Sequence, residues 1–254
     1  MNFTTLDRSN KNKRIKIWAV LVWLILWEIT ARFIGQEILL VSPFTVVWNL
    51  MKMAGKSGFW KSVLFTVSRI AGGFLLAFFT GTILAWAGSV YRFVRELAAP
   101  LMAVIKAAPV ASFIILLLIW IPSRNLSFII SFLIALPVIY TNVLYGIENT
   151  NKELLEMAKV FKVPLRKRIW YIYLSETLPY LRAACSISLG LCWKAGVAAE
   201  VIGIPSGSIG ERLYEAKIYL QTPDLFAWTL TIILLSIWFE KIFLYTMDKV
   251  IRVE

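Results

Sequence analysis

Charged side chains and a proline interrupt the long apolar runs of this sequence at a few positions. Lys194 and Glu200 lie within the run WKAGVAAEVIG, and Lys106 precedes Pro109 in another run. A lysine left in lipid costs at least ~2.5 kcal/mol, so it must face a bundle interior, a partner or a wet cavity. A proline within a helix frees backbone groups that need similar surroundings. We therefore predict that Lys106, Pro109, Lys194 and Glu200 are candidates for lining a path through a membrane.

Lys194 and Glu200 should not pair with each other. On one helix they lie roughly 9 Å apart along the axis and about 120° apart around it. One interpretation is structural, with Glu200 at the outer interface and Lys194 bonded to another helix. The other is that Lys194 lines a solute path and favours an anion, although Glu200 is near enough in sequence to neutralise it.

Enzymatic chemistry has little support in this sequence. Histidine is absent, and no metal-ligand cluster or pair of nucleophile and base is recognisable. Cys185 and Cys192 would lie roughly 10 Å apart along a helix, which is too far for a disulfide. We expect no catalytic residue, no metal and no cofactor.

The composition indicates an all-α integral membrane protein. Hydrophobic residues make up 59% of the 254 residues and charged residues 17%, and the mean hydropathy is +0.73. A chain this apolar cannot bury its surface in one water-soluble core. Its apolar runs predict a single transmembrane domain over residues 17–254 with six transmembrane helices, at about 17–34, 62–88, 97–120, 126–146, 180–201 and 225–247.

Basic residues set the expected orientation. Residues 1–16 are rich in lysine and arginine, and the apolar run that follows them has no cleavage site, so we interpret it as an uncleaved first span. Most lysines and arginines outside the spans fall on the side of the two termini. This side is therefore predicted to be cytoplasmic, in an inner or plasma membrane. The net charge of +12 follows from this topology and does not predict nucleic-acid binding.

Small residues recur every four positions in the second predicted span, at Gly73, Ala77, Gly81 and Ala85. Such spacing lets two membrane helices approach closely. We predict that these residues form a packing seam, either within the subunit or between subunits.

The longest polar interruption is residues 147–179, which we call the elbow. Thr150 and Glu153 have the spacing of a capping box, which predicts a short helix over about 151–161. Pro164 should begin a second short helix after a sharp corner. The result is a compact helical projection with one apolar face, which suits the groove of a partner.

The elbow resembles the cytoplasmic EAA loop of permease subunits of ATP-binding-cassette importers, whose pattern is E-A-A, three residues, Gly, nine residues, I-x-L-P. Glu156, Met157 and Ala158 stand for E-A-A, and Lys162 occupies the glycine position. The segment from Ile172 to Ser175 stands for I-x-L-P. The resemblance implies that ATPase subunits dock on the elbow, through Glu153, Glu156, Met157, Ala158, Phe161, Lys162 and Pro164.

The resemblance extends over most of the chain and is nearest to the branch that serves sulfonate, taurine, nitrate and thiamine-precursor systems. It rests on Ser42-Pro43, Ser68-Arg69, Ala108 to Ala111, the elbow, and WKAGVAAEVIG through Leu213. It implies a permease that is not itself an enzyme, because ATP hydrolysis takes place in a separate subunit. It further implies a second permease copy, an external substrate-binding protein and membrane lipid as partners. The alternative function is a secondary transporter or channel. Internal inverted repeats are common in such proteins, and none is evident in this sequence.

Overall fold

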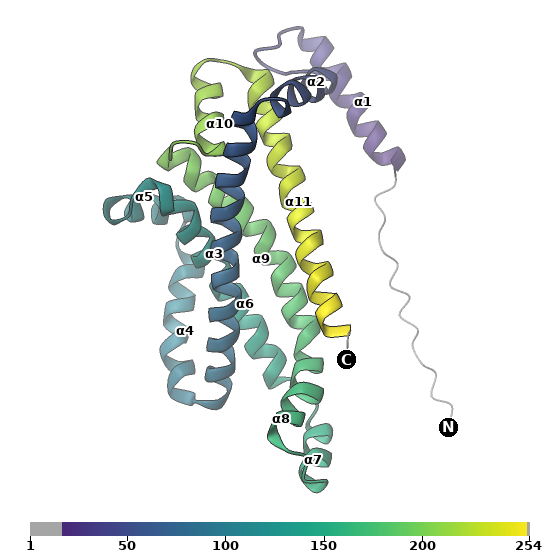
Figure 1. Cartoon of the computed structure of the whole chain (residues 1–254), viewed down its shortest axis with the longest axis vertical. Helices are drawn as coiled ribbons and strands as arrows, with labels where there is room; N and C mark the ends of the chain where they lie inside the picture. Colours follow the sequence, from purple (N-terminus) through teal and green to yellow (C-terminus); the bar gives the residue numbers. More distant parts are fainter. Residues whose placement is uncertain (1–16, 253–254) are drawn as a thin grey trace.

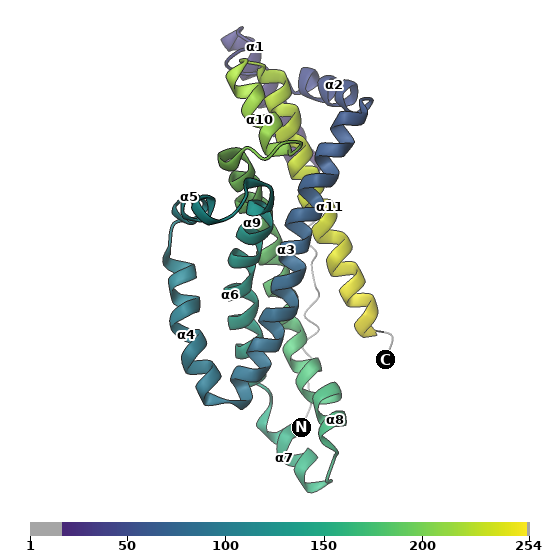
Figure 2. The same ribbon diagram turned by 60° about the vertical axis from the view of Figure 1, so that its left-hand side comes forward.

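The computed structural model describes residues 17–252, with side chains described up to 249, and within that range it is helical with no β-strand. Three long helices form the centre: α3 (Ser57–Val90), α6 (Leu126–Glu148) and α9 (Leu174–Gly203). Helix α6 packs extensively against both α3 and α9. Helix α4 (Arg92–Ala107) stands on one side of this centre and α11 (Thr222–Arg252) on the other (Figures 1 and 2).

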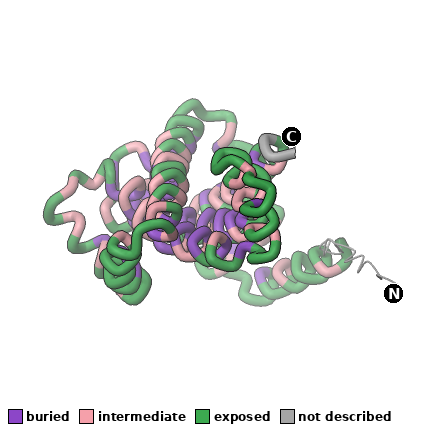
Figure 3. The backbone as a smooth tube through the Cα atoms, turned by 90° about the horizontal axis from the view of Figure 1, so that it is seen from below, coloured by how far each residue is buried: buried purple, intermediate pink, exposed green. Residues whose placement is uncertain are grey.

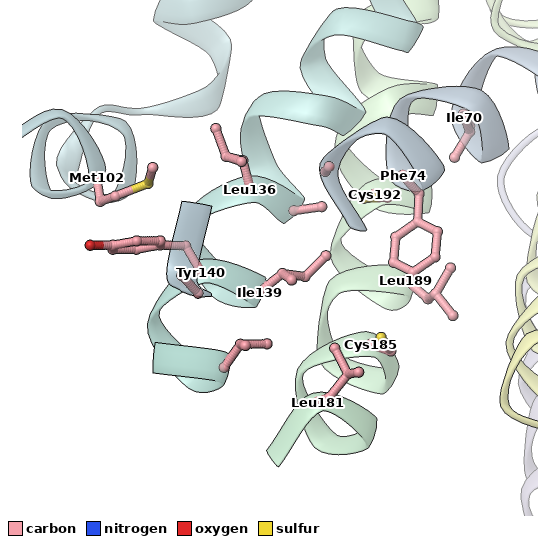
Figure 4. Close-up of a cluster of buried hydrophobic side chains, with 14 of the residues drawn as sticks. Ile70, Phe74, Met102, Leu136, Ile139, Tyr140, Leu181, Cys185, Leu189 and Cys192 are labelled. Atoms are coloured by element: carbon pink, nitrogen blue, oxygen red, sulfur yellow. The ribbon is translucent and has the colours of Figure 1, made fainter. Parts of the chain in front are cut away.

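The core lies where α3, α6 and α9 meet, and Figure 3 shows the buried residues gathered there. Phe74, Ile139 and Leu189 are fully buried in it, and both cysteine side chains are buried beside them (Figure 4). Lipid is as apolar as these side chains, so close van der Waals packing rather than exclusion from water holds such helices together.

All four residues of the proposed seam are buried in α3. A Cβ atom at Gly73 would collide with the backbone oxygen of Phe128, and one at Gly81 would lie 3.1 Å from Ile139 Cγ2. Both neighbours belong to α6. The close approach at these glycines is therefore within one subunit.

The span expected over 97–120 is two helices rather than one kinked helix. Helix α4 ends at Ala107, and α5 (Val110–Trp120) continues at 106° to it. Ala108 has φ −74° and ψ 137°, the extended backbone that a residue before proline prefers. Because Pro109 also lacks an N–H to continue the helix, the chain turns aside here instead of bending slightly.

Between residues 17 and 252, five helical segments are long and apolar enough to cross a membrane, or six if α4 and α5 count as one span. They include α1 (Ile17–Ile34), in which Arg32 pairs with Glu28 at 2.7 Å as the spacing predicts. Helix α3 begins five residues before the expected span. The fifth span begins inside the elbow, because α8 (Leu165–Arg168), a π-helical turn (Ile169–Tyr173) and α9 form one continuous helical segment.

Two short helices lie at the end of the bundle opposite the elbow, and these are α2 (Pro43–Ala54) and α10 (Ile209–Ile218) (Figures 1 and 2). Helix α7 (Lys152–Val160) and α8 form the other end. The chain therefore has short helices at both ends of the bundle, separated by the length of α3.

Candidate functional site

Lys106 and Lys194 line one pocket of about 400 Å³. Lys106 comes from the last turn of α4 and Lys194 from the middle of α9, and both side chains are exposed. Lys106 Nζ donates to Thr141 Oγ1 on α6 at 3.2 Å. The rest of the lining is almost entirely apolar, with Ile134, Pro137 and Leu191 among it. Two cations therefore face an otherwise apolar pocket, which suits a small anion.

The break at Pro109 shapes this pocket. Ala108 and Val110, on either side of the proline, belong to the lining, whereas Pro109 itself is exposed and does not. Helix α5 is apolar all round, and Ile114 is its buried residue. Its side chains Ile115, Leu116 and Ile119 are exposed, so an apolar face stands next to the two-lysine pocket.

Glu200 is not part of this pocket, and it is not at an exposed interface either. Its side chain is 0% exposed. Glu200 Oε2 accepts from Thr66 Oγ1 at 2.7 Å and from the Gly210 N–H at 3.3 Å, and Thr66 Oγ1 accepts from the Ile209 N–H at 3.0 Å. A carboxylate at the start of α10 is favoured by the partial positive charge of a helix N-terminus. Glu200 therefore ties α9 to α3 and α10, and it is separate from Lys194, as their spacing on one helix predicts.

Two residues of that link were not singled out from the sequence. Thr66 is fully buried in α3 and Ser208 caps α10 by accepting from the Glu211 N–H at 2.9 Å. The Glu211 carboxylate in turn accepts from the Gly207 N–H at 2.6 Å. Ser208 and Glu211 have the spacing of a capping box, so the sequence pattern could have predicted this helix cap. Thr66 has none.

The first helix of the elbow is capped one residue later than the sequence suggested. Asn151 is the N-cap of α7, and its side chain accepts from the Glu153 N–H at 2.8 Å. Thr150 instead donates to the Gly146 carbonyl at 3.4 Å. Asparagine is at least as good a cap as threonine, so the capping interaction moves while the helix stays where it was expected.

Lys162 adopts the backbone that a glycine would take. Its φ is +50°. The Val163 N–H donates to the Ala158 carbonyl at 2.9 Å and the Lys162 N–H donates to the Lys159 carbonyl at 3.1 Å, which together form a Schellman motif. Lys162 thus forms the turn that glycine would form at this position of the motif. The left-handed backbone costs the lysine about 1 kcal/mol.

The apolar side chains expected to dock on a partner are not all accessible. Ala158 is only 2% exposed, so it packs inside the elbow. Met157 and Phe161 are exposed, as is their neighbour Val160, and Phe161 is 74% exposed. Glu153, Glu156 and Lys162 are also exposed, and Pro164 is the N-cap of α8. The elbow therefore presents an apolar tip with charged flanks at one end of the molecule (Figure 2).

Residues 73–248 match the family model described as binding-protein-dependent transport system inner membrane component. The chain is 28% identical to the nitrate import permease protein NrtB of Synechococcus elongatus over 77% of its length and 73% of the relative. It is 24% identical to the putative aliphatic sulfonates transport permease protein SsuC of Bacillus subtilis, over 80% and 74%. It is 23% identical to the taurine transport system permease protein TauC of Escherichia coli, over 79% and 74%.

Proposed function

The chain belongs to the family of binding-protein-dependent transport system inner membrane components and is a permease subunit of an ATP-binding-cassette importer, and from this we propose that its elbow and its two-lysine pocket are the two working parts of that subunit. The elbow transmits ATP-driven motion, and the pocket is a section of the solute path. The family match covers residues 73–248 but does not assign a role to either part. The proposal is supported by the exposed apolar tip of the elbow and by the convergence of Lys106 and Lys194 on one pocket.

We propose that an ATPase subunit docks on the elbow and carries out the hydrolysis of ATP. Met157, Val160 and Phe161 form an exposed apolar tip on a capped helix that a groove could receive. The elbow side of the bundle is accordingly the cytoplasmic side. The basic residues Arg92 and Arg95 lie in the first turn of α4, and this end of α4 points toward the elbow end of the bundle (Figure 2), as the positive-inside rule requires.

We propose that a second copy of the chain covers the face that carries α5 and the two-lysine pocket, so that the path forms between two permeases. The exposed apolar side chains of α5 are unsuited to a water-filled path alone but suited to helix packing. An external binding protein then delivers solute to the end that carries α2 and α10. Binding protein and ATP bias outward-open and inward-open states through their different affinities for each.

We propose that the solute is a small anion. The named relatives are permeases for nitrate, sulfonates and taurine, and the two lysines of the pocket have no acidic residue among the lining side chains. Glu200 is buried outside this pocket. Its charge therefore does not neutralise Lys194 there.

The docking proposal is tested by replacing Phe161 with Asp in the full chain, co-expressed with its ATPase subunit. Losing a central apolar contact costs at least ~2 kcal/mol, or roughly thirtyfold in affinity, so co-purification of the ATPase should fall sharply. Ile218→Asp is the matched control, because Ile218 is 55% exposed on α10 at the opposite end. Full ATPase binding by the Phe161 variant would refute the docking site. Facilitated transport without any ATPase would favour the channel or secondary-transporter alternative.

A further inference from the structure

An apolar groove of about 510 Å³ runs beside the π-helical turn, on the elbow side of the bundle. Its lining comes from α3, α6, the π-helical turn and the first turns of α9. Val143 and Leu181 form its buried floor, at 2% and 8% exposure. Ile83 and Trp86 are 66% and 51% exposed, so the groove is open along the side of the molecule rather than enclosed.

The groove has the dimensions of one leaflet. Its lining residues on the π-helical turn and α9 extend from Ile169 to Leu181, which corresponds to about 18 Å of helix. Half of a ~30 Å hydrocarbon core is about 15 Å. Trp86, at the elbow end of the α3 lining, is the kind of residue that sits at a membrane interface. A lipid acyl chain lying along the groove would therefore be matched to it in length.

Three consecutive cations, Arg166, Lys167 and Arg168, directly precede the groove on the same helical segment. Arg166 lies three residues before Ile169 and so falls near the lining face, one turn closer to the elbow. The Nε atom of Arg168 is buried and has no hydrogen-bond partner among the described residues.

Among the described residues, no ion pair joins Arg166, Lys167 or Arg168 to an acidic side chain. Glu148, which follows the lining residue Ile147, is paired with Arg95. Glu176 lies on α9 but is not in the lining. Three cations thus stand on the helical turn directly before the groove, and the groove itself is almost entirely apolar. This combination complements an anionic phospholipid, which has a negative headgroup and apolar acyl chains.

We propose that this groove binds an anionic phospholipid of the elbow-side leaflet, with an acyl chain along Ile83, Trp86 and Leu181 and the phosphate on the Arg166 to Arg168 cluster. The headgroup would then sit within the elbow, directly after the Pro164 corner, where α7 is joined to the helical segment that begins at α8. A π-helical turn is often a functional feature of a helix, and here it forms one wall of the groove. Bound lipid stabilises the angle at which the elbow leaves the membrane.

Quenching of tryptophan fluorescence by brominated lipid tests this site without requiring transport or ATPase. The full chain is reconstituted in phosphatidylcholine vesicles that contain the same small fraction of brominated phosphatidylglycerol or brominated phosphatidylcholine. Brominated phosphatidylglycerol should quench more strongly, and Trp86→Phe should remove that excess. Each cation near a membrane surface contributes roughly a fivefold preference for anionic lipid. Replacing all three with glutamine should therefore abolish the excess, while Arg166→Lys with Arg168→Lys should retain it.

The matched control is Arg92→Gln, because Arg92 is an exposed arginine near the same end, paired with Glu96 at 2.7 Å, and does not line the groove. It should leave the excess unchanged. Equal quenching by the two brominated lipids, or an excess that survives the triple glutamine variant, would overturn the proposal. If the excess is lost only when ATPase subunits are added, then the ATPase rather than lipid occupies the cations in the working complex, and the proposal again fails.

Discussion

Thr66 on α3 donates a 2.7 Å hydrogen bond to the Glu200 carboxylate on α9, and the same hydroxyl oxygen accepts the Ile209 N–H of α10 at 3.0 Å. One hydroxyl thus joins three helices. All of these groups are buried, so none of them can turn to water if a partner is removed.

Removing the Glu200 carboxylate should destabilise the subunit. Glu200→Ala leaves the Thr66 hydroxyl and the Gly210 N–H without their acceptor, which costs about 1–3 kcal/mol. Thermal unfolding of the purified subunit in detergent should show a lower midpoint, with proteolysis near Gly207 as the first cleavage. Glu215→Ala, at a half-buried acid on α10 paired with Arg212, should leave the midpoint unchanged. An unchanged midpoint for Glu200→Ala would mean that the link is not stabilising.

Lys194 should contribute to solute selection. Lys194→Met and Lys106→Met each remove one cation from the pocket, so uptake at limiting solute should fall, with KM raised more than the maximal rate is lowered. Lys241→Met serves as the control, because Lys241 lies on α11 beside a different pocket. Normal uptake by both pocket variants at limiting solute would remove the pocket from the path and leave the lysines a structural role.

Lys162 offers a test of the elbow turn. Its left-handed φ of +50° costs less for glycine than for any side chain and most for a β-branched one. Lys162→Gly should therefore preserve ATPase co-purification and stabilise the turn by about 1 kcal/mol, whereas Lys162→Ile should weaken both. Hydrogen exchange at the Val163 amide, which closes the Schellman motif, reports the turn directly. Equal exchange in the two variants would contradict the geometry.

The seam between α3 and α6 should tolerate no side chain at Gly73. Gly73→Ala places a methyl group against the Phe128 backbone oxygen, and such overpacking costs about 1–3 kcal/mol or more. Gly81→Leu should impair folding for the same reason. Gly190→Ala is the control, since nothing lies within 4 Å of a Cβ at Gly190. The yield of monodisperse protein should separate Gly73 from Gly190, and equal yields would show that α3 and α6 can move apart.

The apolar runs predicted the class of fold and the approximate position of most helices, because membrane-spanning helices leave a long and unambiguous signal. Proline chemistry located the break at Pro109 but not its angle. The 106° turn depends on where α5 finds packing partners, which local sequence does not encode. The N-cap of α7 shows a similar limit, because Thr150 and Asn151 are both residue types that cap helices.

Contacts between residues far apart in the chain are what the sequence does not predict. A charge in an apolar run favours a functional role for Glu200, but its partner Thr66 lies 134 residues away. The motif favours Ala158 as a docking residue, whereas the chain folds back at Lys162 and Ala158 is buried. The convergence of Lys106 and Lys194 on one pocket likewise required the three-dimensional arrangement.

The helices that face the membrane on different sides of the molecule differ in length. Helix α3 has 34 residues and is about 51 Å long, whereas α4 has 16 and is about 24 Å long before the chain turns aside into α5. The hydrocarbon layer is ~30 Å thick, so a bilayer in direct contact with α4 would have to thin there, and each ångström of hydrophobic mismatch costs a fraction of a kcal/mol. A second subunit placed against this short wall, as we propose, would relieve the elastic deformation. Longer acyl chains should then strengthen the proposed pairing through α4 and α5.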